Sequence, residues 1–250
     1  MSNPEAPNGE AIPPVEPTDP LRSRYRDAIA EAQSVLSHLV ARKTALLVID
    51  VQYLDAARGY GVFKDATSSG VPLADQEYYF NSLERTVLPN IARLQATFRE
   101  LNLEVIHTRI MSLTPDGRDR SPGHKRLRLH AGPDSKEAEF LPEVAPEPGE
   151  IVISKTASGV FSATNIEYVL RNLGITALFV AGVYTNECVS TAVRDASDLG
   201  FHVTLVPDAC TTVTAELQAS TIRTLRDRYA RVLKTAAAIR EIRRLAAAGC

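Results

Sequence analysis

Short runs of consecutive apolar residues recur along the chain from residue 44, and segments with helical spacing separate them. Such runs, which lack alternating polar side chains, are typical of strands buried on both faces of a parallel sheet. The expected strands are 44–50, 103–109, 150–154, 176–181, 201–206 and 232–234, and the expected helices are 21–39, 76–101, 164–172, 187–199, 215–228 and 235–248. This alternation predicts an α/β three-layer sandwich with a mainly parallel sheet of about six strands and helices on both faces.

The two ends of the chain differ in composition from what lies between them. Residues 1–20 are rich in proline, and we expect them to form a disordered or loosely draped N-terminal arm. Residues 21–250 carry the alternating pattern, and we expect a single domain. Inside it, the stretch 53–76 reads as a long loop that is expected to be functional, and 110–150 as a lid, a subunit contact or a solvated loop.

The composition argues against several classes of protein. A net charge of -2 gives no reason to expect a nucleic-acid partner. The apolar runs are too short to span a membrane, and the N-terminus lacks the blocks of a signal peptide. The three cysteines form no CxxC pair and the five histidines show no metal-ligand spacing. We therefore expect a cytoplasmic protein with free thiols and with no metal or other cofactor.

Cys188 lies where a predicted strand turns into a predicted helix, within AGVYTNECVSTAV (181–193). Free N–H groups and the positive end of the helix dipole favour a thiolate in the first turn of a helix, and they can bind an oxyanion. The alternative is that Cys188 is a small buried residue near a turn, because free cysteine is usually buried.

Two more reactive side chains share this position at the end of a strand. Asp50 ends the first strand and Lys155 ends the third. Because ligands bind at the carboxyl edge of a parallel sheet, Asp50, Lys155 and Cys188 are expected to meet there. A lysine favours the thiolate by its charge, and an aspartate can accept the thiol proton and return it to a leaving amine. We therefore predict that these three residues are catalytic.

These residues and their surroundings resemble the isochorismatase-like cysteine hydrolases. The similar segments are LLVIDVQ (46–52), HTR (107–109), the Lys155 region with SGVFSATNIEYVL (158–170), and AGVYTNECVSTAVRDASDLGFHVTLVPDAC (181–210). The resemblance implies a Rossmann-like fold and an Asp50–Lys155–Cys188 triad. It further implies that the thiol attacks an amide or ureide carbonyl, and that water hydrolyses the resulting thioester. A cis peptide bond is implied between Val183 and Tyr184, with an oxyanion hole formed by the N–H groups of Tyr184 and Cys188.

The resemblance also bears on substrate, partners and metal. Nicotinamidases carry a metal-binding Asp/His cluster soon after the first aspartate, whereas this chain has YLDA (53–56) there, and isochorismatases that cleave an enol ether lack the cysteine. The favoured reaction is C–N hydrolysis of a small amide, carbamoyl or ureide compound, as in members that act on biuret-like or ureidoacrylate-like substrates. A nicotinamidase-like or other small-amide hydrolase, or a non-catalytic small-molecule-binding member, is the alternative. The family implies a homodimer or homotetramer.

Five side chains are candidates for binding the substrate. Gln52 and Arg109 lie at strand ends, and Arg109 is suited to holding a carboxylate in a bidentate manner. Phe161 and Tyr184 are expected to line the pocket, and Gln218 follows the fifth strand. For each of them a purely structural role, in packing or in a salt bridge, is the alternative.

Overall fold

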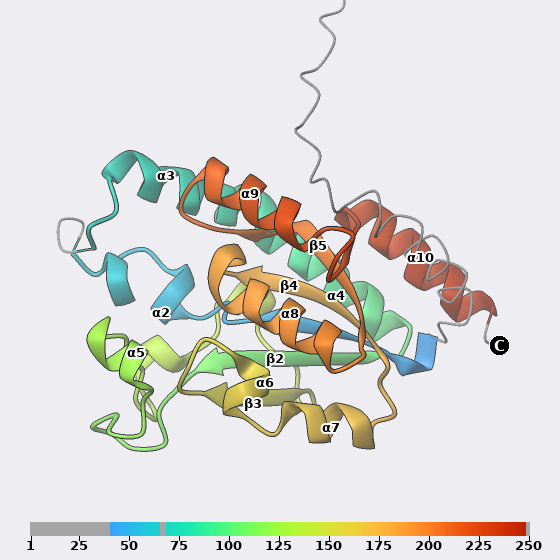
Figure 1. Ribbon diagram of the computed structural model, residues 1–250, viewed down its shortest axis with the longest axis horizontal. Helices are drawn as coiled ribbons and strands as arrows, with labels where there is room; N and C mark the ends of the chain where they lie inside the picture. The colour runs from blue at the N-terminus through green and yellow to red at the C-terminus, as the bar shows by residue number, and fades with distance from the viewer. Residues whose placement is uncertain (1–40, 66–68, 249–250) are drawn as a thin grey trace, which may run out of the picture.

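The computed structural model describes residues 41–65 and 69–248, and these form one six-stranded sheet in the order β3-β2-β1-β4-β5-β6. The strands are β1 (Thr44–Ile49), β2 (Glu104–Ile110), β3 (Ile151–Lys155), β4 (Ala177–Val183), β5 (His202–Thr211) and β6 (Arg231–Val232). Every pair of neighbouring strands is parallel (Figure 1). The predicted fold is therefore confirmed, while the expected arm 1–20 and helix 21–39 lie outside the described residues.

Helices cover both faces of this sheet, so the domain has three layers. The longer helices are α3 (Leu73–Ser82), α4 (Leu88–Glu100), α7 (Ile166–Asn172), α8 (Ser190–Asp198), α9 (Ala215–Leu225) and α10 (Thr235–Ala248), and the short ones are α2 (Tyr53–Ala56), α5 (Pro122–Arg126) and α6 (Val160–Ala163). Side chains of α3, α4 and α10 pack in one core cluster, and those of α6, α7, α8 and α9 pack in the other.

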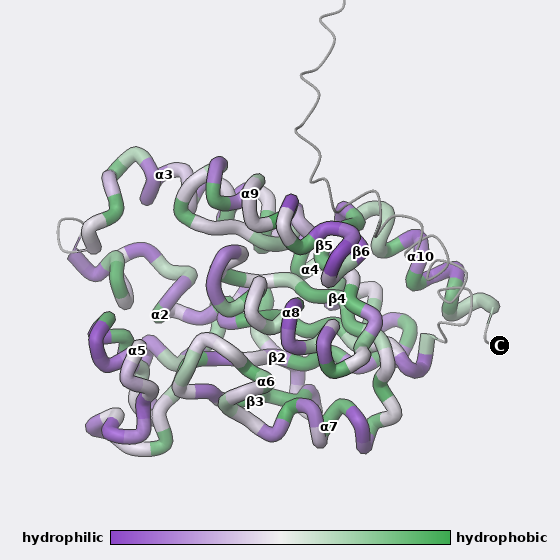
Figure 2. Tube along the Cα trace, in the orientation of Figure 1, coloured by the Kyte–Doolittle hydropathy of each residue, from purple (hydrophilic) through white to green (hydrophobic). Residues whose placement is uncertain are grey.

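Strand β1 shows why the sheet must be covered on both sides. Leu46 and Val48 belong to one core cluster, whereas Ala45, Leu47 and Ile49 belong to the other, and none is more than 1% exposed. Because successive side chains of a strand point to opposite faces, an unbroken apolar run needs two apolar layers. Figure 2 shows the same property as hydrophobic colouring along β4, with hydrophilic segments in the loops at the periphery.

The structure differs from the prediction in two segments after β1. The loop expected at 53–76 holds α2 and a 3-10 turn at Gly61–Phe63, and α3 already begins at Leu73. The long helix expected at 76–101 passes through a π-helical turn at Leu83–Val87, directly before Pro89. Proline has no N–H to donate to the preceding turn, which accounts for the altered bonding there.

Strand β5 also runs further than expected, through Pro207 to Thr211. Its pairing with β4 shifts register between Val180 and Gly182, which is how a strand accommodates a proline. The segment therefore stays in the sheet where the sequence predicted a loop.

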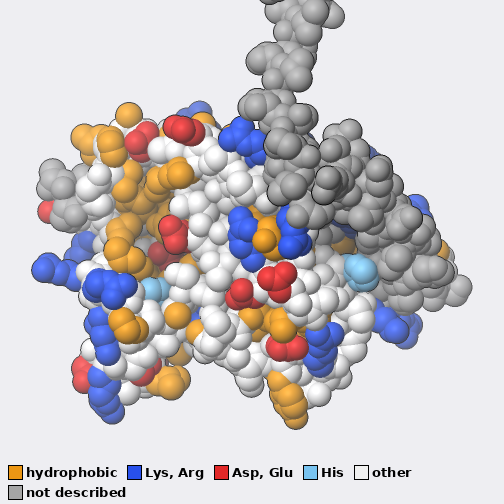
Figure 3. Space-filling view, viewed as in Figure 1, with side chains coloured by type: hydrophobic (Ala, Val, Ile, Leu, Met, Phe, Trp, Pro, Cys, Tyr) orange, Lys and Arg blue, Asp and Glu red, His pale blue; other side chains and the backbone are white. Residues whose placement is uncertain are grey.

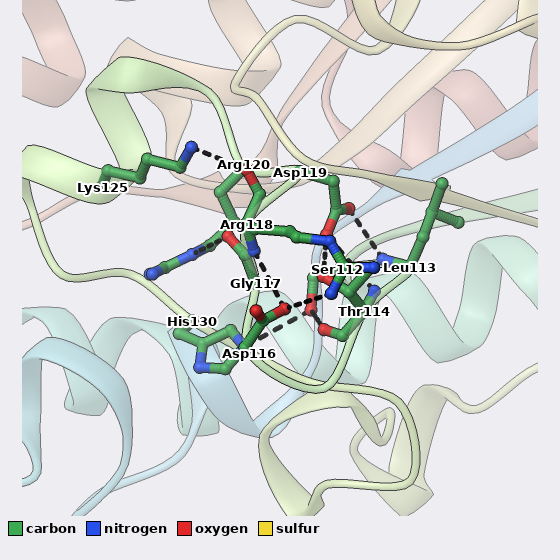
Figure 4. Close-up of polar contacts among 10 residues, drawn as sticks. All are labelled: Ser112, Leu113, Thr114, Asp116, Gly117, Arg118, Asp119, Arg120, Lys125 and His130. Carbon is green, nitrogen blue, oxygen red and sulfur yellow. Dashed lines mark hydrogen bonds and ion pairs between the residues drawn. The ribbon is translucent and has the colours of Figure 1, made fainter.

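The connection between β2 and β3 is held together by its own polar contacts (Figure 4). The Asp119 carboxylate accepts hydrogen bonds from the Thr114 hydroxyl and from the main-chain N–H groups of Leu113 and Thr114. These contacts, the Thr114 hydroxyl foremost, lower the pKa of Asp119 to about 2. The Ser121 N–H donates to the Thr156 carbonyl at 2.9 Å, so α5 is fastened beside the chain that follows β3. This segment is thus an ordered wall at the carboxyl edge of the sheet.

Candidate active site

The structure brings together the three side chains predicted at strand ends. Lys155 Nζ lies 2.7 Å from Asp50 Oδ2 and 3.3 Å from Cys188 Sγ. Its third partner is the Ala157 carbonyl, at 3.0 Å. An ammonium group has three N–H donors, and each has an acceptor here. Lys155 therefore connects the carboxylate to the thiol at the carboxyl edge of the sheet.

Asp50 is held on this edge by the neighbouring strand. It follows β1 directly with a φ of 54°, and its N–H donates to the Thr108 carbonyl at 3.1 Å. The Thr108 hydroxyl donates to Asp50 Oδ1 at 2.7 Å. One carboxylate oxygen is thus oriented by β2, and the other faces Lys155.

Cys188 is positioned by an unusual chain path after β4. Gly182 has a φ of 121°, and a Cβ on it would lie 2.1 Å from the Ile49 carbonyl oxygen, so only glycine fits so close to β1. The Val183–Tyr184 peptide bond is cis, as the family resemblance implied. The next turn, Thr185–Val189, is π-helical with a non-helical Glu187, and α8 begins only at Ser190. The expected helix start at Glu187 is therefore wrong, and Cys188 lies in the irregular turn before α8.

Burial sets the ionisation of this group. Asp50, Lys155 and Cys188 are 0%, 1% and 6% exposed. Although burial favours neutral Lys155, the charge of Asp50 raises its pKa above the ordinary value, so it remains an ammonium. Burial raises the pKa of Cys188 well above its ordinary value, and Lys155 only partly opposes this shift. The resting site therefore holds a neutral thiol beside an ion pair, in place of the expected thiolate.

Gln52 has a different role from the one predicted for it. Its side chain is fully buried, and its amide oxygen accepts the Ile110 N–H at 2.5 Å. The amide nitrogen donates to the carbonyls of Ile110, at 2.9 Å, and Glu137, at 2.8 Å. Both ends of the amide are therefore bonded to the main chain and not to Asp50. Gln52 fastens the chain after β1 to the end of β2.

Arg109 is also engaged elsewhere. Its guanidinium donates to Ser154 Oγ at 3.2 Å and to the Ala138 carbonyl at 3.3 Å. Because Arg109 and Thr108 are consecutive in β2, their side chains leave opposite faces of the sheet, and Thr108 is the one that reaches Asp50. The structure therefore does not bring Arg109 to the triad.

Phe161 and Gln218 make packing and main-chain contacts. The Phe161 ring lies 6.0 Å from that of Phe201, which precedes β5 at the amino edge of the sheet, away from the triad. The Gln218 amide nitrogen donates to the carbonyls of Pro207, at 3.2 Å, and Cys210, at 3.1 Å, and so ties α9 to β5. The structural alternative describes both residues.

Tyr184 borders the site together with a residue that strand-end position does not reveal. Its hydroxyl donates to the Asp55 carbonyl at 2.9 Å, and the Tyr79 hydroxyl donates to the same oxygen at 2.7 Å. The Asp55 side chain is 4% exposed, and burial together with the charge of Asp50, partly opposed by Lys155, raises its pKa to about 7. Asp55 is thus in the electrostatic field of the triad. Its only signal in the sequence is its closeness to Asp50.

His124 on α5 is the second such residue. Its side chain is 2% exposed; burial lowers its pKa, Lys155 lowers it further and Asp50 opposes the shift. The irregular spacing of 110–150 gave no means of placing this histidine beside Lys155. Within residues 41–65 and 69–248, no group of three or more His, Cys, Asp or Glu is arranged to hold a metal ion. None of the helices in these ranges has the length and apolarity needed to cross a membrane.

The protein is an α/β protein with an all-parallel sheet, and in such proteins ligands bind beside the carboxyl ends of the strands. Its Cys–Lys–Asp group lies at that edge. The isochorismatase domain model matches residues 44–237, and the chain belongs to this family of hydrolases.

Comparison with individual proteins agrees with this assignment. The chain is 28% identical to the maleamate amidohydrolase of Pseudomonas putida over 82% of its own length and 89% of that protein. It is 27% identical to the ureidoacrylate amidohydrolase RutB of Variovorax paradoxus, over 68% of this chain and 69% of the relative. Some other relatives align over less than two thirds of their own length. The crystal structure of a cysteine hydrolase from Pseudomonas syringae has the same fold, with a TM-score of 0.67 at 22% identity over 83% of this chain and 95% of that one.

Proposed function

We propose that this protein is a cysteine amidohydrolase that cleaves a C–N bond of a small amide, carbamoyl or ureide compound. The observation that carries the proposal is the bridging position of Lys155, which lies within 2.7 Å of the Asp50 carboxylate and 3.3 Å of the Cys188 thiol. A nucleophile, a proton acceptor and a fixed positive charge are the parts that acyl transfer to a thiol requires. The amidohydrolase names of two relatives support the same reaction type.

The reaction begins from the neutral thiol. Burial raises the pKa of Cys188, and the charge of Asp50 and its hydrogen bond with the thiol raise it further, which supports Asp50 as the acceptor of the thiol proton. As Sγ attacks the carbonyl carbon, the proton moves to Asp50, and the carbonyl oxygen becomes an oxyanion bound by the N–H groups of Tyr184 and Cys188. Asp50 then donates the proton to the leaving nitrogen, the C–N bond breaks, and ammonia or an amine leaves a thioester on Cys188.

Hydrolysis of the thioester reverses these roles. Asp50 accepts a proton from water, the hydroxide oxygen adds to the thioester carbon, and the C–S bond breaks. The proton returns to sulfur, so the acid product leaves and the thiol is restored. Lys155 remains an ammonium throughout, stabilising negative charge on Asp50 and on sulfur in turn.

Ammonia release from a panel of small amides, carbamoyl amino acids and linear ureides tests this function. Cys188→Ala should lower turnover by at least about a thousandfold. Cys210→Ala is the matched control, because Cys210 is also buried but only its weak contact with the Val180 carbonyl, at 3.9 Å, is lost. Hydroxylamine should trap the thioester as a hydroxamate with the wild type and not with Cys188→Ala.

The alternatives predict other results. A Cys188→Ala protein that releases ammonia at the wild-type rate would contradict the thiol mechanism. Hydrolysis of nicotinamide alone within the panel favours a nicotinamidase-like enzyme. Saturable binding of panel compounds without any turnover favours a non-catalytic binding protein on the same fold.

A further inference from the structure

Asp55 has a buried carboxylate oxygen with no hydrogen-bond partner. The atom is Oδ2, on a side chain that is 4% exposed. Buried polar atoms nearly always have a partner, and leaving one unpaired is costly, so such an atom indicates either a bound water or a ligand site. The absence of a partner is not explained by disorder, because the backbone of Asp55 is fixed at both ends.

Three hydrogen bonds fix that backbone. The Asp55 N–H donates to the Gln52 carbonyl at 3.2 Å, and its carbonyl accepts from the hydroxyls of Tyr79 and Tyr184. Tyr184 is the residue that follows the cis peptide bond and borders the proposed oxyanion hole. The backbone that carries the carboxyl group is therefore fixed, and the charges of Asp50 and Lys155 act on that group.

A second unpartnered atom lies beside the same triad. His124 Nδ1 is buried and makes no hydrogen bond, and the charges of Lys155 and Asp50 act on its ring. His124 belongs to α5, whereas Asp55 belongs to α2, and both helices lie at the carboxyl edge of the sheet (Figure 1). Two independent elements thus each place a buried polar atom without a partner within reach of the charges of Asp50 and Lys155.

We propose that Asp55 is a substrate-binding residue whose carboxylate accepts an N–H located on the acyl side of the scissile carbonyl. This inference rests on the proposed amidohydrolase function and names its substrate class. A carboxylate can only accept hydrogen bonds, so its partner must be a donor. A ureide, R–NH–CO–NH₂, has a donor at this position, whereas a simple amide, R–CH₂–CO–NH₂, has none and leaves Oδ2 unpaired. The site therefore selects ureides and carbamoyl compounds over simple amides.

Two pairs of probes isolate this single difference. Biuret and malonamide differ only in an NH that replaces a CH₂ beside the scissile carbonyl, and N-carbamoylglycine and succinamate differ in the same way. The wild type should show a kcat/KM for the ureide member at least tenfold above that for the amide member in one or both pairs. Asp55→Ala and Asp55→Leu, which have no acceptor at this position, should bring this ratio close to one. Asp116→Asn is the control, because it removes an exposed carboxylate that contacts Arg118.

The pH dependence of the ratio gives a second measurement. Since the pKa of Asp55 is raised to about 7, the ureide preference should increase between pH 6 and pH 8 in the wild type and stay constant in Asp55→Asn. The other titratable groups that interact with Asp55 are Asp50, Lys155 and Cys188 of the triad, and Tyr79 and Tyr184. These groups serve both members of a pair, so their titration cancels in the ratio.

The outcomes separate this inference from the proposed function. If the wild type hydrolyses both members of each pair at similar kcat/KM, or if Asp55→Leu keeps the wild-type ratio, the role of Asp55 is refuted and the amidohydrolase function stands. If the wild type hydrolyses none of the four probes or the wider panel, the proposed function fails and the inference fails with it. Far-UV circular dichroism of the Asp55 variants shows whether they are folded.

Discussion

Replacing Lys155 by methionine should strongly destabilise the fold as well as abolish catalysis. The substitution keeps an unbranched side chain that is one heavy atom shorter, and it removes the cation that lies 2.7 Å from Asp50. Asp50 is 0% exposed, so its charge would be left in the interior with only the Thr108 hydroxyl and no positive neighbour. Removal of one partner from a buried ion pair costs about 3–5 kcal/mol, and the Ala157 carbonyl loses its hydrogen bond as well.

A cost of this size is a large part of the total stability of a domain, which is about 5–15 kcal/mol. Urea unfolding followed by far-UV circular dichroism measures it, since the chain has no tryptophan for a fluorescence signal. The Asp50→Asn/Lys155→Met double variant should be more stable than Lys155→Met, because it buries no unpaired charge. Lys136→Met, which breaks an exposed pair with Glu139 and an exposed cation–π contact with Tyr53, is the control and should lose no more than about 1 kcal/mol.

This reasoning would be refuted by either of two results. Lys155→Met could unfold within about 1 kcal/mol of the wild type, which would mean that the pair makes no net contribution to folding. The double variant could also be no more stable than Lys155→Met, which would mean that the loss comes from packing and not from the unpaired carboxylate. All variants are compared at one protein concentration, because assembly of subunits changes apparent stability.

Three further predictions concern the backbone, the buried acid and the assembly. Gly182→Ala should cost at least about 3 kcal/mol in urea unfolding, because its Cβ would meet the Ile49 carbonyl oxygen at 2.1 Å. Gly149→Ala is the control and should cost only about 1 kcal/mol, because Gly149 has a φ of 97° and no atom within 4 Å. Equal losses would contradict the steric argument. Folding raises the pKa of Asp55 from an ordinary 3.8 to about 7, so the folded state binds the proton more tightly and loses up to about 4 kcal/mol of stability as pH rises from 4 to 7. Asp55→Asn should therefore be more stable than the wild type at pH 8 and not at pH 4, and a stability difference independent of pH would exclude this account. Hydrophobic side chains gather around α3 in Figure 3, and Leu73 of α3 is 65% exposed. We therefore expect light scattering to show a dimer or tetramer, and Leu73→Glu should weaken its assembly. A monomeric wild type would contradict this expectation.

The parts of the fold that follow from local sequence were predictable. The unbroken apolar run of β1 requires burial on two faces, and this alone placed it at the centre of a parallel sheet. The boundaries were missed where tertiary structure overrides local preference. Pro207 normally ends a strand, yet the register shift beside Gly182 keeps it in β5, and α2 has only four residues, too few to show a helical period.

The candidate site divides in the same way. Asp50, Lys155 and Cys188 were placed together by one rule, that the carboxyl ends of parallel strands share an edge. The side chains of Gln52 and Gln218 were misjudged, because a polar residue near that edge serves equally well to bind main-chain carbonyls, and both do so. The ionisation of Cys188 was misjudged because burial outweighs the neighbouring cation, and burial is a property of the assembled fold.

The order of the strands has a consequence for synthesis on the ribosome. The carboxylate, the amine and the thiol come from the end of β1, from β3 and from the turn after β4, and β1 lies between β2 and β4 in the sheet. A nascent chain does not contain the whole triad outside the ribosome until residue 188 has left the exit tunnel. Contacts between residues this distant along the chain form slowly. A growing chain therefore lacks the complete triad until β1, β3 and β4 have all emerged, and β5 and β6 join the sheet after it.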